Sequence, residues 1–97
     1  MATGDTTQGR RYPDVDHSAG RCALMEPGGY RFARYSENMA CWECCTPDGS
    51  LGNLSAHQVA VHEDGTITVS PSILIHGGPG MREMWHGWLE RGVFMEA

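Results

Sequence analysis

The sequence predicts a mainly β fold, in which one small domain is built around an antiparallel sheet of hairpins. Two stretches that alternate apolar and polar residues, 57–62 and 66–69, flank Asp64-Gly65, and this arrangement is typical of a β-hairpin. A further alternating stretch, 84–94, contains the turn dipeptide Arg91-Gly92 and predicts a second hairpin. Thirteen glycines and five prolines indicate many turns, and no stretch shows a sustained helical period.

Length and composition limit the number of domains that the chain can form. A chain of 97 residues is enough for one domain, and it buries only about two thirds of its unfolded surface, so its core is thin. Residues 1–20 are polar, and we expect a disordered or loosely draped tail there. Residues 21–97 form the single small β-rich domain. The sequence shows no apolar run of membrane-spanning length and no apolar signal-peptide core, so we expect a cytoplasmic protein.

The charge is acidic and unevenly distributed. Residues 1–35 carry net +1 and residues 36–97 carry net −6, which gives −5 for the chain. Such a surface repels phosphate groups, so nucleic acid is not an expected partner. All seven basic residues are arginine, which we interpret as the coding bias of high-GC genomes such as those of actinobacteria and their phages. The expected location is therefore the cytoplasm of a bacterial host.

Shorter elements complete the predicted sheet. Residues 22–25 predict a short strand before the Pro-Gly-Gly turn at 27–29, and the aromatic–arginine alternation at 30–32 predicts a half-buried strand. Ser-Pro-Ser at 70–72 interrupts the next apolar run, and Ile-Leu-Ile at 73–75 predicts a separate buried strand. In the last hairpin, alternation places the side chains of residues 85, 87 and 89 on one face of the sheet and those of 86, 88 and 90 on the other.

The cysteines predict a metal site. Cys41 and Cys44 have the C-x2-C spacing of half a zinc knuckle, in which a tight turn lets two thiolates face one ion, and Cys45 follows directly. In a reducing cytoplasm closely spaced cysteines bind metal more often than they form disulfides. Two other interpretations stay open, namely reduced structural cysteines in a turn and a redox dithiol.

Histidines supply the remaining candidate ligands. His86 lies among large apolar residues in a predicted core strand, where a buried imidazole needs partners for both ring nitrogens, either a metal or a structural hydrogen bond. His57 and His62 are five residues apart, so on a regular strand they face opposite sides and do not share one ion. The predicted zinc ligands are Cys41, Cys44 and His86 with a fourth from Cys45, His57 or His76, of which we choose His76.

The stretch 64–94 reads D-G-T-I-T-V-S-P-S-I-L, then a Gly-rich loop, then W-H-G-W-L-E-R-G-V-F. This pattern resembles a family of small phage and bacterial proteins of unknown function, some of which carry the label ammonia monooxygenase. The resemblance implies a small β-rich fold and a zinc site that involves His86, and it supplies no activity. Many members place a Cys near the motif His, whereas this chain has Met84-Trp85 there. The matching residues are Ser70, Pro71, Ser72, Ile73, His86, Trp88 and Gly92, with Cys41 and Cys44 upstream.

These observations lead to three functional hypotheses. The leading one is a non-enzymatic, phage-encoded protein of the actinobacteriophage kind, which binds a host protein and carries a structural zinc ion. The second is a metal-free, β-rich homodimer with a patch formed by Trp85, Trp88 and Phe94. The third is a small zinc hydrolase or thiol enzyme with Glu43 or Glu63 as general base, although no hydrolase motif or nucleophilic-cysteine signature is present.

Overall fold

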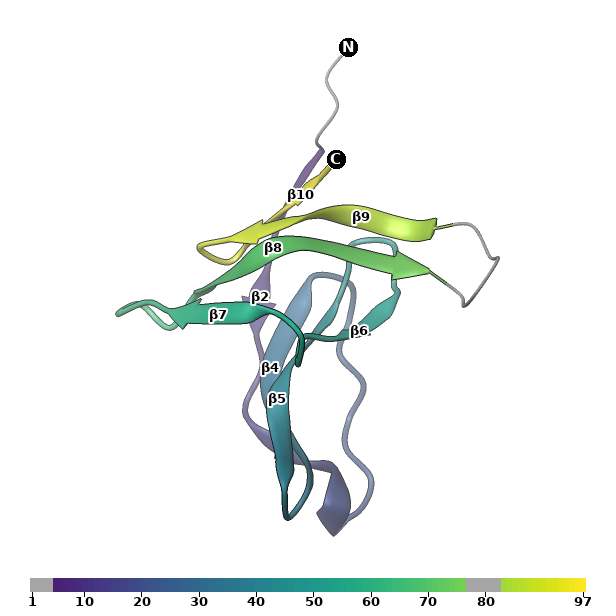
Figure 1. Cartoon of the computed structure of the whole chain (residues 1–97), viewed down its shortest axis with the longest axis vertical. Coiled ribbons are helices and arrows are strands. Elements are labelled where there is room, and N and C mark those ends of the chain that lie inside the picture. Colours follow the sequence, from purple (N-terminus) through teal and green to yellow (C-terminus); the bar gives the residue numbers. More distant parts are fainter. Residues whose placement is uncertain (1–4, 77–82) are drawn as a thin grey trace.

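Two β-sheets pack against each other, with their strands crossing at a steep angle (Figure 1). The computed structural model describes residues 5–76 and 83–97. Sheet A has the strand order β1-β10-β9-β8-β7, and sheet B has the order β2-β4-β5-β6, with β3 also paired to β4. The elements are β1 (Thr6–Gln8), β2 (Arg10–Arg11), β3 (Val15–Asp16), the short 3-10 helix η1 (His17–Ala19), β4 (Gly29–Ser36), β5 (Met39–Cys45), β6 (Leu51–Asn53), β7 (Gln58–Val61), β8 (Ile67–His76), β9 (Glu83–Glu90) and β10 (Val93–Glu96).

The mainly β, antiparallel prediction is confirmed, and the two predicted hairpins are present. Strands β7 and β8 pair from Val61 opposite Ile67, and β9 and β10 pair from Glu90 opposite Val93. The second hairpin closes through Arg91 and Gly92, whose φ angles of 44° and 78° are both positive. A two-residue turn with this geometry matches the twist of the strands that it joins. Within the described residues, no helix is long and apolar enough to cross a bilayer.

The structure differs from the predicted elements at residues 70–72 and 22–25, among other places. Residues 70–72 do not end a strand, because β8 runs through them and takes up the Ser-Pro-Ser as a register shift against β9 between Val69 and Ile73. Proline is tolerated in a bulge because a bulged residue does not donate a backbone hydrogen bond to the neighbouring strand. Residues 22–25 form no strand, and Leu24 is 80% exposed.

The segment expected to be a loosely ordered tail contributes three short strands where it is described. β1 extends sheet A beside β10, and β2 and β3 pair in parallel with β4. The amides of Gly9 and Tyr12 donate to the carbonyls of Gly92 and Tyr30, at 2.7 and 2.8 Å. The polar composition of the segment gave no signal for this strand pairing, because the contacts are made by backbone groups and need no apolar side chain.

The core lies between the two sheets. Trp85 and Phe94 meet edge to face inside it, with ring centroids 6.0 Å apart. The predicted surface patch of Trp85, Trp88 and Phe94 is therefore wrong for two of its three members, and only Trp88, which is 40% exposed, lies at the surface. The alternation predicted for 85–90 is confirmed, since residues 85, 87 and 89 are buried. The core cluster comprises Tyr30, Cys44, Leu54, Ile67, Val69, Ile73, Trp85, Leu89 and Phe94.

Candidate functional site

The two cysteines of the predicted zinc knuckle lie in strand β5 and not in a turn. Side chains three residues apart on an extended strand point to opposite faces of the sheet. Cys44 is fully buried in the core cluster, whereas the Sγ of Cys41 lies on the other face of sheet B, where it donates to Asn53 Oδ1 at 3.4 Å. The structure therefore does not aim the two sulfurs at one position, and Cys45 shares the face of Cys41.

Of the predicted histidine ligands, His86 and His57 have described side chains, and neither joins Cys41 or Cys44. His86 is on the outer face of β9, with its Nε2 3.1 Å from Ser72 Oγ and its ring beside that of Trp88. Because Cys44 points into the core, sheet A separates it from the His86 ring. His57 places its Nε2 3.2 Å from the carbonyl oxygen of Ser72. His76 is the last residue of β8, and its side chain lies outside the described residues.

These residues do not fit a structural zinc ion, which takes four converging Cys or His ligands. Among the side chains that the structure describes, those of residues 5–75 and 84–97, no three from His, Cys, Asp or Glu gather at a position that could hold a metal. For His86, the structure favours the hydrogen-bonded alternative that the sequence left open. For Cys41, Cys44 and Cys45, it favours structural thiols, which belong to a strand where a turn was expected.

We expect a chelator such as EDTA to leave the melting temperature of the protein unchanged. A structural zinc ion contributes on the order of 10 kcal/mol to folding, so its removal would lower the melting temperature sharply. Thermal unfolding with and without EDTA, together with elemental analysis of the purified protein, measures both quantities. Stoichiometric zinc with a chelator-sensitive melting temperature would contradict this result.

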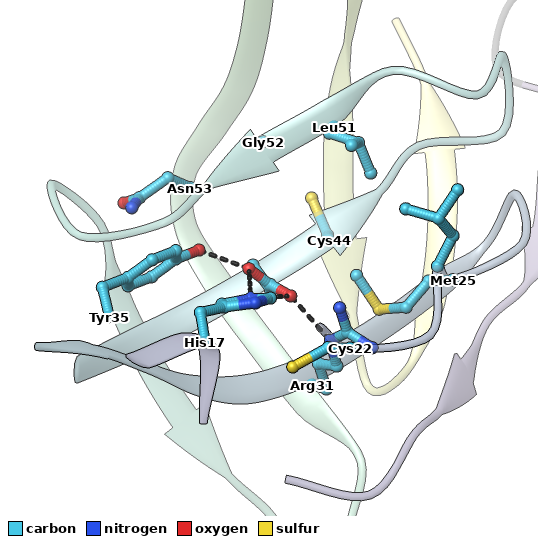
Figure 2. A pocket seen from close by; sticks show the side chains of 11 residues that line it. His17, Cys22, Met25, Arg31, Tyr35, Cys44, Leu51, Gly52 and Asn53 are labelled. Carbon is cyan, nitrogen blue, oxygen red and sulfur yellow. Dashed lines mark hydrogen bonds and ion pairs between the residues drawn. The ribbon is translucent and has the colours of Figure 1, made fainter. Parts of the chain in front are cut away.

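A cavity of about 460 Å³ lies on the face of sheet B that is turned away from the core. We call it the sheet B cavity. Residues of β4, β5 and β6 form its floor and one wall, and the segment 17–25, which crosses this face, forms the other wall (Figure 2). Its lining residues are His17, Cys22, Leu24, Met25, Arg31, Tyr35, Glu43, Cys44, Leu51, Gly52 and Asn53.

Glu43 is the centre of a polar cluster at the floor of this cavity. Arg31 Nε donates to one carboxylate oxygen at 2.6 Å, and the Tyr35 hydroxyl donates to the other. The Nε2 of His17 lies 3.2 Å from both oxygens, and it must be the donor because a carboxylate only accepts. Figure 2 shows these contacts converging from β4 on one side and from η1 on the other.

The cluster also attaches the crossing segment to sheet B. Arg31 Nη1 donates to the carbonyl oxygen of Ala23 at 2.7 Å, and the His17 ring stacks on that of Tyr35 with centroids 5.0 Å apart. Both ends of the segment are therefore held by residues that also contact Glu43. Since Arg31 and Glu43 are 5% and 9% exposed, their charges offset each other in a mostly dry environment.

The electrostatics of the cavity do not favour catalysis. Burial raises the pKa of Glu43, but hydrogen bonds from Tyr35, Arg31 and His17 outweigh burial and hold the pKa below its usual value, which makes this carboxylate a poor general base. Burial raises the pKa of Cys44 to about 12, so it is a neutral thiol and not a nucleophile near neutral pH. Cys22 donates to the carbonyl oxygens of Asp16 and Gly20, at 3.7 and 3.9 Å, and no histidine with a described side chain is hydrogen-bonded to it.

Sequence reasoning named Glu43 only as a possible base and did not group it with His17, Arg31 and Tyr35. The opposite charges of Arg31 and Glu43 were visible, but the turn at Glu37-Asn38 alone does not set them opposite each other. A register shift between Arg34 and Ser36 brings Arg31 opposite Glu43 in the β4–β5 hairpin, where opposite charges form a cross-strand pair. The contribution of His17 depends on how the segment 17–25 crosses the sheet, and no local pattern encodes that path.

No protein-family model, no curated protein and no solved structure matches this chain.

Proposed function

We propose that this is a non-enzymatic binding protein whose sheet B cavity receives an apolar side chain of a partner protein. The observation that carries the proposal is the contrast between the floor of the cavity and its rim. At the floor, Glu43 and Arg31 already hold each other, so no charged ligand is needed to neutralise either. At the rim, Leu24 and Leu51 are 80% and 62% exposed on opposite walls.

Exposed leucines beside a concave site are a common feature of protein-binding surfaces. An apolar anchor that fills a pocket supplies much of the free energy of association, and the surrounding contacts exclude water. Leu24 and Leu51 would close over such an anchor, and Met25 at the base of the wall has a side chain that adapts to different shapes. The nearly neutral floor favours an uncharged anchor over a phosphate or a carboxylate.

The partner that we propose is a host protein, with this chain encoded by a phage and acting in the bacterial cytoplasm. The arginine-only basic residues and the resemblance of the stretch 64–94 to small phage proteins support this part of the proposal. Zinc is not included, since the described residues do not form a ligand set. The thiol-enzyme alternative is not favoured, because the buried Cys44 is neutral and the Cys22 thiol donates to two backbone carbonyls.

We expect Leu24→Glu and Leu51→Glu each to abolish partner binding and to leave the fold intact. Both side chains are exposed, so a carboxylate there costs little stability but adds a charge that must be desolvated when an apolar anchor enters. Immobilised wild-type protein and variants are exposed to lysate from an actinobacterial host, and captured proteins are quantified by mass spectrometry. The identified partner is then titrated against each variant by calorimetry.

Val61→Glu is the matched control, because Val61 is 55% exposed on sheet A, away from the cavity. We expect it to bind as the wild type does. A partner whose affinity is unchanged by both leucine substitutions, or is reduced equally by the control, would show that the sheet B cavity is not the binding site.

A further inference from the structure

Sheet A has an outer face that is turned away from sheet B (Figure 1). Exposed apolar side chains of β8 and β9 lie on this face. Alternation along β9 places Met84, His86 and Trp88 there, opposite the buried Trp85 and Leu89. Met84 is 55% exposed and Trp88 is 40% exposed. Pairing across the sheet continues the row on both sides, with Leu74 opposite His86 and Met95 opposite Trp88. We call this set, Leu74, Met84, His86, Trp88 and Met95, the outer apolar face.

The outer apolar face has almost no charge. Among the described side chains that alternate to it from β1, β7, β8, β9 and β10, only Glu90 is ionisable as an acid and none is arginine. The chain as a whole carries −5, so its charged residues lie elsewhere. A surface of this kind gives a nucleic acid or an anionic membrane no cation to bind. It also gives a strongly basic protein only one carboxylate to pair with.

We propose that a second copy of this chain covers the outer apolar face, so that the two A sheets pack face to face in a symmetric dimer. The charge pattern fits this occupant. Two chains of charge −5 repel each other, and this repulsion is lowest through a face on which Glu90 is the one described acid. In a two-fold contact the same patch lies on both subunits, so Leu74 and Trp88 of each copy meet the apolar residues of the other. Sheets stacked in this way lie about 10 Å apart.

Trp88 is placed to be the central anchor of this contact. It lies on β9, the middle strand of sheet A, between His86 on its own strand and Met95 on the neighbouring strand. The His86 ring is tilted against it with centroids 5.8 Å apart, and Ser72 Oγ lies 3.1 Å from His86 Nε2. These contacts hold both rings in place before association, so little side-chain freedom is lost when the face is covered.

Light scattering coupled to gel filtration tests the dimer. We expect the wild-type mass to be twice the 10.6 kDa of one chain at micromolar concentration. Leu74→Glu and Trp88→Glu should each halve the measured mass, because the two-fold axis brings two new carboxylates into an apolar contact. Circular dichroism checks that each variant remains folded. A wild-type mass of one chain at every concentration up to ~100 μM, which corresponds to an association free energy weaker than about 5.5 kcal/mol, would overturn the proposal.

Val61→Glu separates this dimer from one formed by strand edges. Val61 lies on the edge strand β7 and is 55% exposed, like Met84, but it is not part of the outer apolar face. We expect this variant to keep the mass of a dimer. A monomeric Val61→Glu protein beside dimeric Leu74→Glu and Trp88→Glu proteins would assign the contact to the β7 edge and overturn the face-to-face arrangement.

Ionic strength gives a second, independent readout. Added salt screens the repulsion between two acidic copies and leaves an apolar contact intact, so the dimer dissociation constant should fall as salt rises. A dissociation constant that rises with salt would mean that ion pairs hold the two chains together, which the outer apolar face cannot supply. Because the leucines of the sheet B cavity are untouched in these experiments, a failure here leaves the proposed host binding unaffected.

Discussion

Glu43→Gln is expected to lower the free energy of unfolding by about 3–5 kcal/mol, which is the usual cost of removing one partner of a buried ion pair. The substitution keeps the shape of the side chain but removes its charge, so Arg31 remains 5% exposed without a counter-charge. Two further donors, from Tyr35 and His17, lose a charged acceptor. Urea denaturation measures the loss. Because small domains unfold with only about 5–15 kcal/mol, this single amide would remove much of the total.

The control for this result is Glu37→Gln, which changes an exposed carboxylate in the turn of the same hairpin and should alter stability by less than about 0.5 kcal/mol. A second comparison is the double substitution of Arg31 and Glu43 by methionine. Because it leaves no unpaired charge, it should cost less than Glu43→Gln alone. A loss below about 1 kcal/mol for Glu43→Gln would mean that water, and not the carboxylate, satisfies Arg31.

The stability of the wild type and of Glu43→Gln, measured as a function of pH, shows how the contribution of Glu43 depends on its ionisation. The pKa of Glu43 in the folded chain is held below its usual value of 4.5. Its contribution to stability is therefore complete above pH 4.5 and is lost as the pH falls through the lower folded pKa. Wild type and Glu43→Gln should differ most near neutral pH and converge in acid. Using the difference between the two proteins cancels the effect of other carboxylates, such as Asp48, whose pKa values are also lowered.

Trp85→Ala is expected to cost about 3–5 kcal/mol, and Trp88→Ala less than about 1 kcal/mol when measured on the monomer. The two residues lie on the same strand, but Trp85 is 3% exposed in the core and Trp88 is 40% exposed on the outer apolar face. Denaturation at a protein concentration below the dimer range isolates the monomer. Equal losses for the two variants would contradict the assignment of strand faces.

Trp85→Phe refines this comparison. Within the described residues, Trp85 Nε1 is buried without a hydrogen-bond partner, and an unsatisfied buried donor costs about 1–3 kcal/mol. Phenylalanine removes that donor and keeps an aromatic ring against Phe94. The loss for Trp85→Phe should therefore be well below that for Trp85→Ala, which removes the ring as well.

The hairpins could be predicted from the sequence because their signals are local. Asp64-Gly65 and Arg91-Gly92 are turn dipeptides between alternating stretches, and each encodes its own register. The pairing of β1 with β10 could not be predicted, since it joins the two ends of the chain through backbone groups that are the same in every sequence.

The turn that the zinc prediction assumed for the cysteines is a strand, and the sequence did not reveal this for a related reason. A C-x2-C spacing has opposite meanings in a turn and in a strand, because the turn brings two sulfurs together and the strand directs them to opposite faces. Choosing between them required knowing that Met39 to Cys44 pair with β4, from Ser36 opposite Met39 to Tyr30 opposite Cys44. A register shift between Arg34 and Ser36 lies within this pairing and brings Arg31 opposite Glu43, and the turn residues do not encode that shift. The same shift brings together the polar cluster of the candidate site.

The attachment of the segment 17–25 to sheet B by Glu43 affects how an alanine scan should be interpreted. Glu43 is 9% exposed and already holds three neighbours, so an incoming protein need not touch it. Its replacement would nevertheless release the wall that carries Leu24 and weaken binding. A scan that measures affinity alone would therefore assign Glu43 to the binding surface. Only a parallel measurement of stability would show that Glu43 acts by holding the segment 17–25 in place.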